Sequence, residues 1–163
     1  MRTPTIALAI ATALIATPAL ALDDPAALIR QLYRTKNLLD TPAQADRFLA
    51  RDMAAAYKRQ LADSENAGAA VDFDWRWDTQ DELGTDLVIA EKFVARPGGN
   101  KAGRTTAPRA IVVASFKREG ESLSIGYDLC LGPKGWRIAD AWDQGRQWSL
   151  RDLLELKGKP LRC

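Results

Sequence analysis

Residues 123–142 decide the fold of this 163-residue chain, and they read LSIGYDLCLGPKGWRIADAW. From Leu123 to Leu131 every second side chain is large and apolar, which is the pattern of a strand with one buried face. The opposite face carries small and polar residues, and Cys130 is one of them. GPKG at 132–135 is typical of a tight turn, and Trp136–Trp142 continues as a second strand. This stretch therefore predicts an antiparallel hairpin that lies against a core.

Two further apolar runs precede the hairpin, at 86–95 and 109–117. Four consecutive strands with short connections predict an antiparallel meander. Upstream, Asp24 before Pro25 and TPAQ at 41–44 are helix-start signals, and a third helical pattern covers 52–61, followed by a linker at 65–70. SLRD at 149–152 starts a short last helix through Leu156. The prediction is an α+β domain with three N-terminal helices packed on a curved antiparallel four-stranded meander, and a short C-terminal helix.

Residues 1–21 have the features of a secretory signal peptide. Arg2 supplies the positive charge, residues 6–16 form an apolar segment too short to cross a bilayer, and Ala19-Leu20-Ala21 fits a cleavage site. We expect cleavage before Leu22, a single domain over 22–163, and a periplasmic location in a bacterium. The alternative is an uncleaved N-terminal anchor. No later run of 18 apolar residues exists, so the mature chain is expected to have no membrane span.

Composition excludes several kinds of chemistry. The chain contains no histidine and two cysteines, so triads with an imidazole base and the common zinc, haem and iron–sulfur sites lack their ligands. We therefore expect no metal and no cofactor. The formal net charge is +2, without the basic excess of a nucleic-acid binder. No catalytic residue is assigned.

The two cysteines, Cys130 and Cys163, have two interpretations. One is a reactive thiol or a bridge between chains. The other is an intramolecular disulfide that pins the C-terminal residue to the hairpin, which export would permit. We predict the disulfide.

The C-terminal third resembles a known family. Tyr127-Asp128-Leu129-Cys130-Leu131, then Gly135-Trp136-Arg137-Ile138-Ala139-Asp140 and Ser149-Leu150-Arg151-Asp152-Leu153-Leu154, are similar to the domain of unknown function 3828 family of small bacterial envelope proteins. The helical segment around residues 48–53 and the middle segment around 72–81 fit the same pattern. The resemblance implies a nuclear transport factor 2-like (cystatin-like) cone, and it brings no established chemistry with it.

Asp140 is the most interesting single residue of the sequence. By strand alternation it shares a face with Trp136, Ile138 and Trp142, and a carboxyl group in an apolar pocket can act as an acid or base. We name Asp140, Tyr33, Tyr57 and Trp142 as candidate ligand-binding residues of one cavity. The alternative is that Asp140 accepts hydrogen bonds from the backbone or an arginine and fixes the end of the strand.

Acidic residues between 72 and 82 surround Trp75 and Trp77. A twelve-residue calcium loop starting at Asp72 would need glycine at the position of Trp77, so that interpretation fails. A carbohydrate-binding surface and a solvated entry into the sheet with both tryptophans packed on the core remain, and we predict the second.

Two classes of function follow as hypotheses. The first is a non-enzymatic periplasmic binding domain whose partner is an envelope protein, which could be a toxin, or a small ligand. The second is a small isomerase or hydrolase that uses Asp140 in an apolar cavity. A structural envelope component is a third, plainer possibility. A deep cavity that holds Asp140 with Tyr33 or Tyr57 would favour the enzyme, and a filled interior would favour binding.

Overall fold

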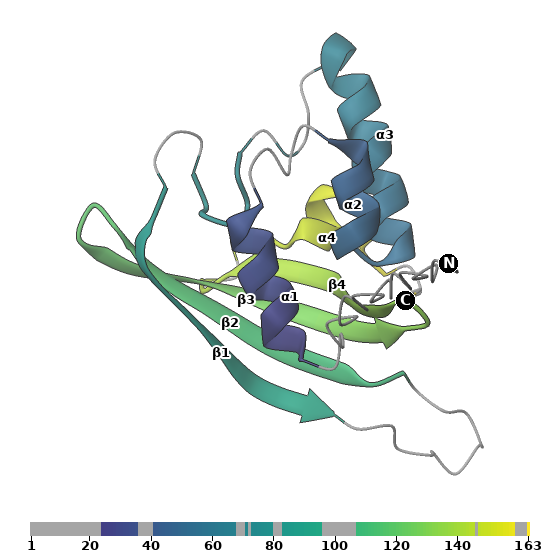
Figure 1. Cartoon of the computed structure of the whole chain (residues 1–163). Helices are drawn as coiled ribbons and strands as arrows, with labels where there is room; N and C mark the ends of the chain where they lie inside the picture. The colour runs from purple at the N-terminus through teal and green to yellow at the C-terminus, as the bar shows by residue number, and fades with distance from the viewer. Residues whose placement is uncertain are drawn as a thin grey trace, which may run out of the picture.

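The computed structural model describes residues 24–35, 41–67, 71, 73–79, 83–95, 107–145, 147–158 and 163. It consists of a four-stranded antiparallel open sheet in the order β1-β2-β3-β4 with helices around it, which is an α+β architecture (Figure 1). The leader predicted for residues 1–21 lies outside the described residues. No described helix combines the length and the apolar character that crossing a membrane requires.

The strands follow the predicted order closely. They are β1 (Thr85–Ala95), β2 (Arg109–Arg118), β3 (Glu121–Gly132) and β4 (Gly135–Asp143). Each strand pairs with the next one along the chain, as a meander requires. Pro133 and Lys134 turn β3 into β4, and Gly135 takes a φ of 93°, which favours glycine because it has no Cβ.

One face of the sheet, which we call the inner face, is buried. Alternate residues of β2 and β3 lie on it, and cross-strand pairing brings Val112 opposite Tyr127 and Ala114 opposite Ile125. Helix α1 (Pro25–Arg34) contacts β1 and β2 on this side, and its Leu28, Ile29 and Leu32 are buried. Asp24 caps α1 as predicted, because its Oδ1 accepts the amide of Ala26 at 2.8 Å.

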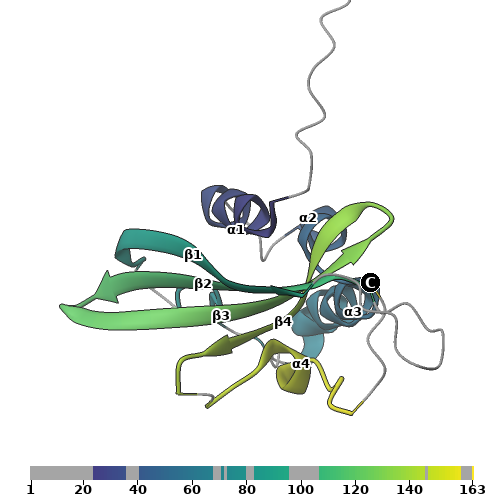
Figure 2. The same cartoon turned by 90° about the horizontal axis from the view of Figure 1, so that it is seen from below.

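The other helices gather at the β4 side of the sheet. Helices α2 (Pro42–Phe48) and α3 (Arg51–Ala67) pack mainly on each other, and α2 also contacts β4. Helix α4 (Leu150–Leu153) follows β4, and Figure 2 shows α1 and α4 on opposite sides of the sheet. Between α2 and α3, Leu49 bridges to Ile138 in parallel, and the Ala50 amide donates to the Ile138 carbonyl at 2.7 Å. This short pairing covers part of the β4 edge.

Two predicted helix ends were wrong. Helix α3 continues to Ala67 instead of ending near Leu61, because no helix breaker occurs before Gly68. It therefore includes the start of the predicted linker. The last helix spans Leu150–Leu153 and does not reach Leu156, since Glu155 takes a φ of 56° in the left-handed region. Its predicted start is confirmed, because the Ser149 hydroxyl accepts the amide of Asp152 at 3.2 Å.

Candidate functional site

The four candidate residues do not converge on one cavity, because β4 contains a bulge. Asp128 pairs with Asp140, but the next residue, Leu129, pairs with Ile138. Ala139 is therefore the extra residue, and it reverses the alternation for the rest of the strand. Trp136 and Ile138 stay on the inner face, whereas Asp140 and Trp142 lie on the opposite, outer face. The predicted common face was wrong, since a bulge of this kind leaves no mark in the spacing of apolar residues.

Asp140 is held by backbone groups. Its Oδ1 accepts the amide of Ala141 at 2.8 Å and the amide of Arg151, in the first turn of α4, at 3.0 Å. Burial raises the pKa of the carboxyl group, and the two amides and the Ser149 side chain oppose that rise. These contacts are those of the structural alternative, in which Asp140 joins the end of β4 to α4.

Trp142 lies against the outer face of β3. A Cβ added to Gly126, its cross-strand partner, would meet the indole ring at 2.4 Å. The ring thus rests directly on the backbone of Gly126 and uses the space that any side chain there would fill. Only glycine fits at position 126 with the indole in this place.

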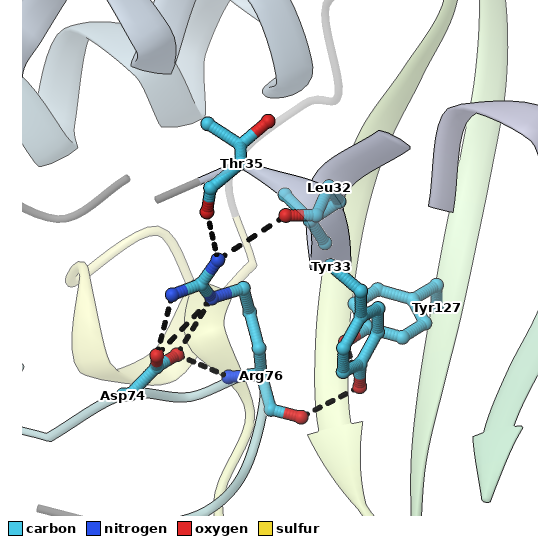
Figure 3. A network of polar contacts seen from close by, with 6 residues as sticks. All are labelled: Leu32, Tyr33, Thr35, Asp74, Arg76 and Tyr127. Atoms are coloured by element: carbon cyan, nitrogen blue, oxygen red, sulfur yellow. Dashed lines mark hydrogen bonds and ion pairs between the residues drawn. The ribbon is translucent and has the colours of Figure 1, made fainter. Parts of the chain in front are cut away.

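Tyr33 reaches the inner face from α1. Its hydroxyl donates to the Arg76 carbonyl at 2.6 Å and lies 2.9 Å from the hydroxyl of Tyr127, as Figure 3 shows. Burial raises the pKa of both tyrosines well above the ordinary value of 10. Both phenols therefore stay protonated at any physiological pH, and each has a partner.

Arg76 forms a buried clamp on the end of α1 (Figure 3). Its guanidinium contacts the Asp74 carboxylate at 2.6 Å and donates to the carbonyls of Leu32 and Thr35 at 3.2 and 2.7 Å. The side chains of Arg76 and Asp74 are 9% and 14% exposed. We call this group the Arg76 clamp, and it stabilises the C-terminal end of α1, where carbonyl groups lack helical partners.

The tryptophans of the acidic segment pack on the core, as predicted. Trp75 and Trp77 are 1% and 8% exposed, and Trp77 makes edge contacts with Tyr33 and Phe116. Buried rings cannot serve as a platform for a sugar. Asp72, Asp81 and Glu82 of the same segment lie outside the described residues.

Tyr57 is also part of a filled interior. It is buried on α3 and borders a cavity of about 10 Å³ with Phe48 and Trp75 among its walls. A space of this size is at the lower limit for one water molecule. The cavity that the described residues form beside Tyr57 is therefore too small for a substrate.

The predicted disulfide between Cys130 and Cys163 is present. Cys130 is fully buried against Ala50 and Ala139, so the bridge joins the outer face of β3 to the C-terminal residue. A Cβ at Gly132 would approach the Cys163 carbonyl to 3.0 Å, so the backbone of Cys163 lies directly on the β3–β4 hairpin.

A groove of about 510 Å³ lies beside this disulfide, and it is the largest of the cavities described here. We call it the hairpin groove. One wall is the β3–β4 turn with Cys163, and the other is the end of α2 and the start of α3. Its lining is Asp46, Leu49, Arg51, Ala54, Gly132, Pro133, Lys134, Gly135, Arg137 and Cys163.

Three basic side chains line the hairpin groove: Arg51 at the start of α3, Lys134 in the turn and Arg137 on β4. Within the described part of the chain, none of them forms an ion pair. Arg137 donates to the Trp136 carbonyl at 2.7 Å, and burial lowers the pKa of its guanidinium, which nevertheless stays charged. Basic side chains therefore outnumber acidic ones in the groove lining by three to one.

No pattern in the sequence marks the hairpin groove. Arg51, Lys134 and Arg137 are spread over 87 positions and belong to no motif. The three positive charges form a cluster only because the fold places the hairpin turn next to the start of α3. The Cys163 disulfide was the one signal that pointed to this end of the molecule.

No protein-family model, no curated protein and no solved structure matches this chain.

Proposed function

We propose that this chain is an exported, non-catalytic binding domain that holds its partner in the hairpin groove. The observation that carries the proposal is the groove itself. It has the volume of a ligand site, and its three cations have no acidic partner among the described residues. Charged side chains that the fold does not pair are available to a ligand at little cost in stability.

The alternative, an isomerase or hydrolase that uses Asp140, has less support. Asp140 and Tyr33 lie on opposite sides of the sheet, so they cannot act on one substrate. The acceptor atom Oδ1 of Asp140 is already engaged by two amides. The Tyr33 hydroxyl donates to the Arg76 carbonyl and the Tyr127 hydroxyl pairs with that of Tyr33, so neither phenol is poised to transfer a proton.

We also propose that the chain is exported, that its fold is a nuclear transport factor 2-like cone, and that it belongs to the family its C-terminal motifs resemble. The predicted leader at 1–21 and the Cys130–Cys163 bridge both support an oxidising compartment such as the periplasm. The curved sheet with α1 across one face is compatible with a nuclear transport factor 2-like cone. Membership of the domain of unknown function 3828 family stays a prediction from the C-terminal motifs.

The experiment uses the chain from Leu22 onward, immobilised and incubated with an envelope extract of the source organism. Bound proteins and small molecules are identified by mass spectrometry. The groove variant carries Arg51→Ala, Lys134→Ala and Arg137→Ala. The control variant carries Arg34→Ala, Lys117→Ala and Lys157→Ala, which removes three exposed cations elsewhere.

We expect a partner that the parent and the control variant retain and the groove variant loses. The same set of bound molecules on all three proteins, or none on the parent, would contradict the proposal.

A further inference from the structure

The hairpin groove offers positive charge from both of its walls. Arg51 stands on the helical wall, whereas Lys134 and Arg137 belong to the hairpin. A ligand that satisfies all three must present negative charge on more than one side. The volume of about 510 Å³ also exceeds what a single small ion would fill.

Two acidic side chains near the groove, Asp46 and Asp52, are paired with other cations. Asp46 is the acidic side chain among the lining residues, and both its oxygens lie 2.8 Å from the Lys58 ammonium group. Asp52, next to Arg51 in the chain, lies 3.3 Å from Arg151. Neither carboxylate is therefore committed to Arg51, Lys134 or Arg137.

A second groove of about 270 Å³, between α1 and β1, provides an internal comparison. Arg30 and Arg34 line it, together with Tyr33, Leu87 and Ile89. Asp24 neutralises Arg30 at 2.5 Å, so Arg34 is the cation of this groove that has no ion-pair partner among the described residues. The hairpin groove differs by having three, two of them guanidinium groups.

Guanidinium groups determine which anions fit. Arginine presents parallel N–H donors that match the two oxygens of a carboxylate or a phosphate, and such charge-assisted hydrogen bonds are about twice as strong as neutral ones. Between the cations the lining includes the exposed ring of Pro133, and its acidic side chain, Asp46, is paired with Lys58. The groove is thus built for oxyanions that are joined by a neutral backbone.

We infer that the ligand of the hairpin groove is a multivalent oxyanion, a molecule that carries two or more carboxylate or phosphate groups on one backbone. This inference rests on the proposed function and adds the chemical class of the ligand. Arg51 and Arg137 contact separate oxyanion groups, and Lys134 at the tip of the turn contacts the second of them from the solvent side. A ligand with a single negative charge pairs with the cations of one wall and leaves those of the other wall without a counter-charge.

The test is calorimetric titration of the disulfide-bonded protein at low ionic strength with four probes. They are acetate with one carboxylate, citrate with three, pyrophosphate with two phosphates, and a hexaglutamate peptide. We expect acetate to bind at least about 100-fold more weakly than the best multivalent probe. Comparison of citrate and hexaglutamate with pyrophosphate identifies carboxylate or phosphate as the preferred source.

Single alanine substitutions test whether the best probe binds in the hairpin groove. Each of Arg51→Ala, Lys134→Ala and Arg137→Ala is expected to weaken the best probe by about tenfold, and Arg34→Ala by less than about twofold. Added salt should weaken it as well. Equal affinity for acetate, or equal loss in the Arg34 variant, would overturn the inference.

The two proposals fail in different ways. If no probe binds but an envelope partner is lost in the groove variant, the ligand is not a multivalent oxyanion and the binding function stands. If the probes bind and no envelope partner depends on the groove, the oxyanion inference stands and the partner-binding function fails.

Discussion

Arginine side chains have opposite surroundings in two regions of this molecule, the Arg76 clamp and the hairpin groove. In the Arg76 clamp, the guanidinium is buried, and each of its three nitrogens donates to the Asp74 carboxylate or to a carbonyl group of Leu32 or Thr35. In the hairpin groove, Arg51 and Arg137 line an open space and pair with no carboxylate of the described residues. The same side chain thus serves the fold in one place and is left available to a ligand in the other. The difference lies in what surrounds the charge, and that can be tested by removing charges from each region.

The largest effect is expected at the clamp. Arg76→Met should lower the free energy of unfolding by about 3–5 kcal/mol, because it leaves Asp74 buried without a counter-charge. The Leu32 and Thr35 carbonyls would lose their donor as well. Urea melts at pH 7 measure the loss.

Its control removes both charges. Asp74→Leu combined with Arg76→Met should recover part of the loss, since no unpaired carboxylate remains. A cost below about 1 kcal/mol for Arg76→Met alone would mean that the clamp is not structural, and the comparison between the two regions would fail.

Reduction of the Cys130–Cys163 bridge should have the next largest effect. The bridge closes a loop with a sequence separation of 33, for which chain entropy gives about 3–4 kcal/mol. Because Cys163 forms part of the groove wall, reduction should also weaken ligand binding. Urea melts with and without dithiothreitol, with Cys130→Ser plus Cys163→Ser as the control, measure the first effect. An unchanged midpoint after complete reduction would rule out the bridge as a staple.

Asp140→Ala should cost about 1–3 kcal/mol, because the amides of Ala141 and Arg151 lose their acceptor. Asp140→Asn keeps an oxygen in place and should cost less than about 1 kcal/mol. If the asparagine variant is as unstable as the alanine variant, Asp140 stabilises the fold through its charge and not through the hydrogen bonds that its oxygen accepts.

The pH dependence of the Asp140 variants follows from the direction of its pKa. Burial raises the pKa of Asp140 above the usual 3.8, so the folded protein holds this proton more tightly than the unfolded chain does. The group therefore stabilises the fold below its unfolded pKa, and that contribution is lost as pH rises through the folded pKa. Asp140→Asn should gain on the parent between about pH 4 and pH 7. If Asp140→Asn instead loses stability relative to the parent as the pH rises, the raised pKa of Asp140 is wrong.

Tyr33→Phe should cost about 1 kcal/mol. The substitution removes the donor to the Arg76 carbonyl and the partner of the Tyr127 hydroxyl, while the ring keeps its edge contact with Trp77. A urea melt beside the parent measures it. A loss as large as that of Arg76→Met would show that the phenol, and not the ion pair, holds the clamp together.

The sequence predicted the sheet better than the site. The strand order follows from apolar alternation and from the short turns after β2 and β3, because a meander leaves few other pairings for consecutive strands. The cap at Asp24 and the burial of Trp75 were also predictable. The bulge at Ala139 was not, since one inserted residue changes the face of Asp140 without changing the composition.

The clamp and the groove depend on contacts between distant segments. Arg76 bonds to carbonyls more than 40 positions away, and no local pattern marks it as buried. In the sequence, Arg51 and Lys134 look like ordinary surface residues. They share a site only because α3 and the hairpin lie side by side in the fold. Single-sequence patterns describe neighbours in the chain, so sites assembled from several elements escape them.

If the proposed function is right, the cations of the hairpin groove serve a ligand and not the fold. The most direct measurement is the urea midpoint of the parent and of the Arg51→Ala, Lys134→Ala, Arg137→Ala variant, with and without citrate. Without citrate the two free energies of unfolding should differ by no more than about 1.5 kcal/mol, because the three cations form no ion pair among the described residues and the variant loses one hydrogen bond, from Arg137 to the Trp136 carbonyl. With citrate the parent should gain stability through binding to the folded state, and the groove variant should not gain beyond the general salt effect. An equal gain in both proteins, or a large loss of stability in the variant alone, would contradict the account.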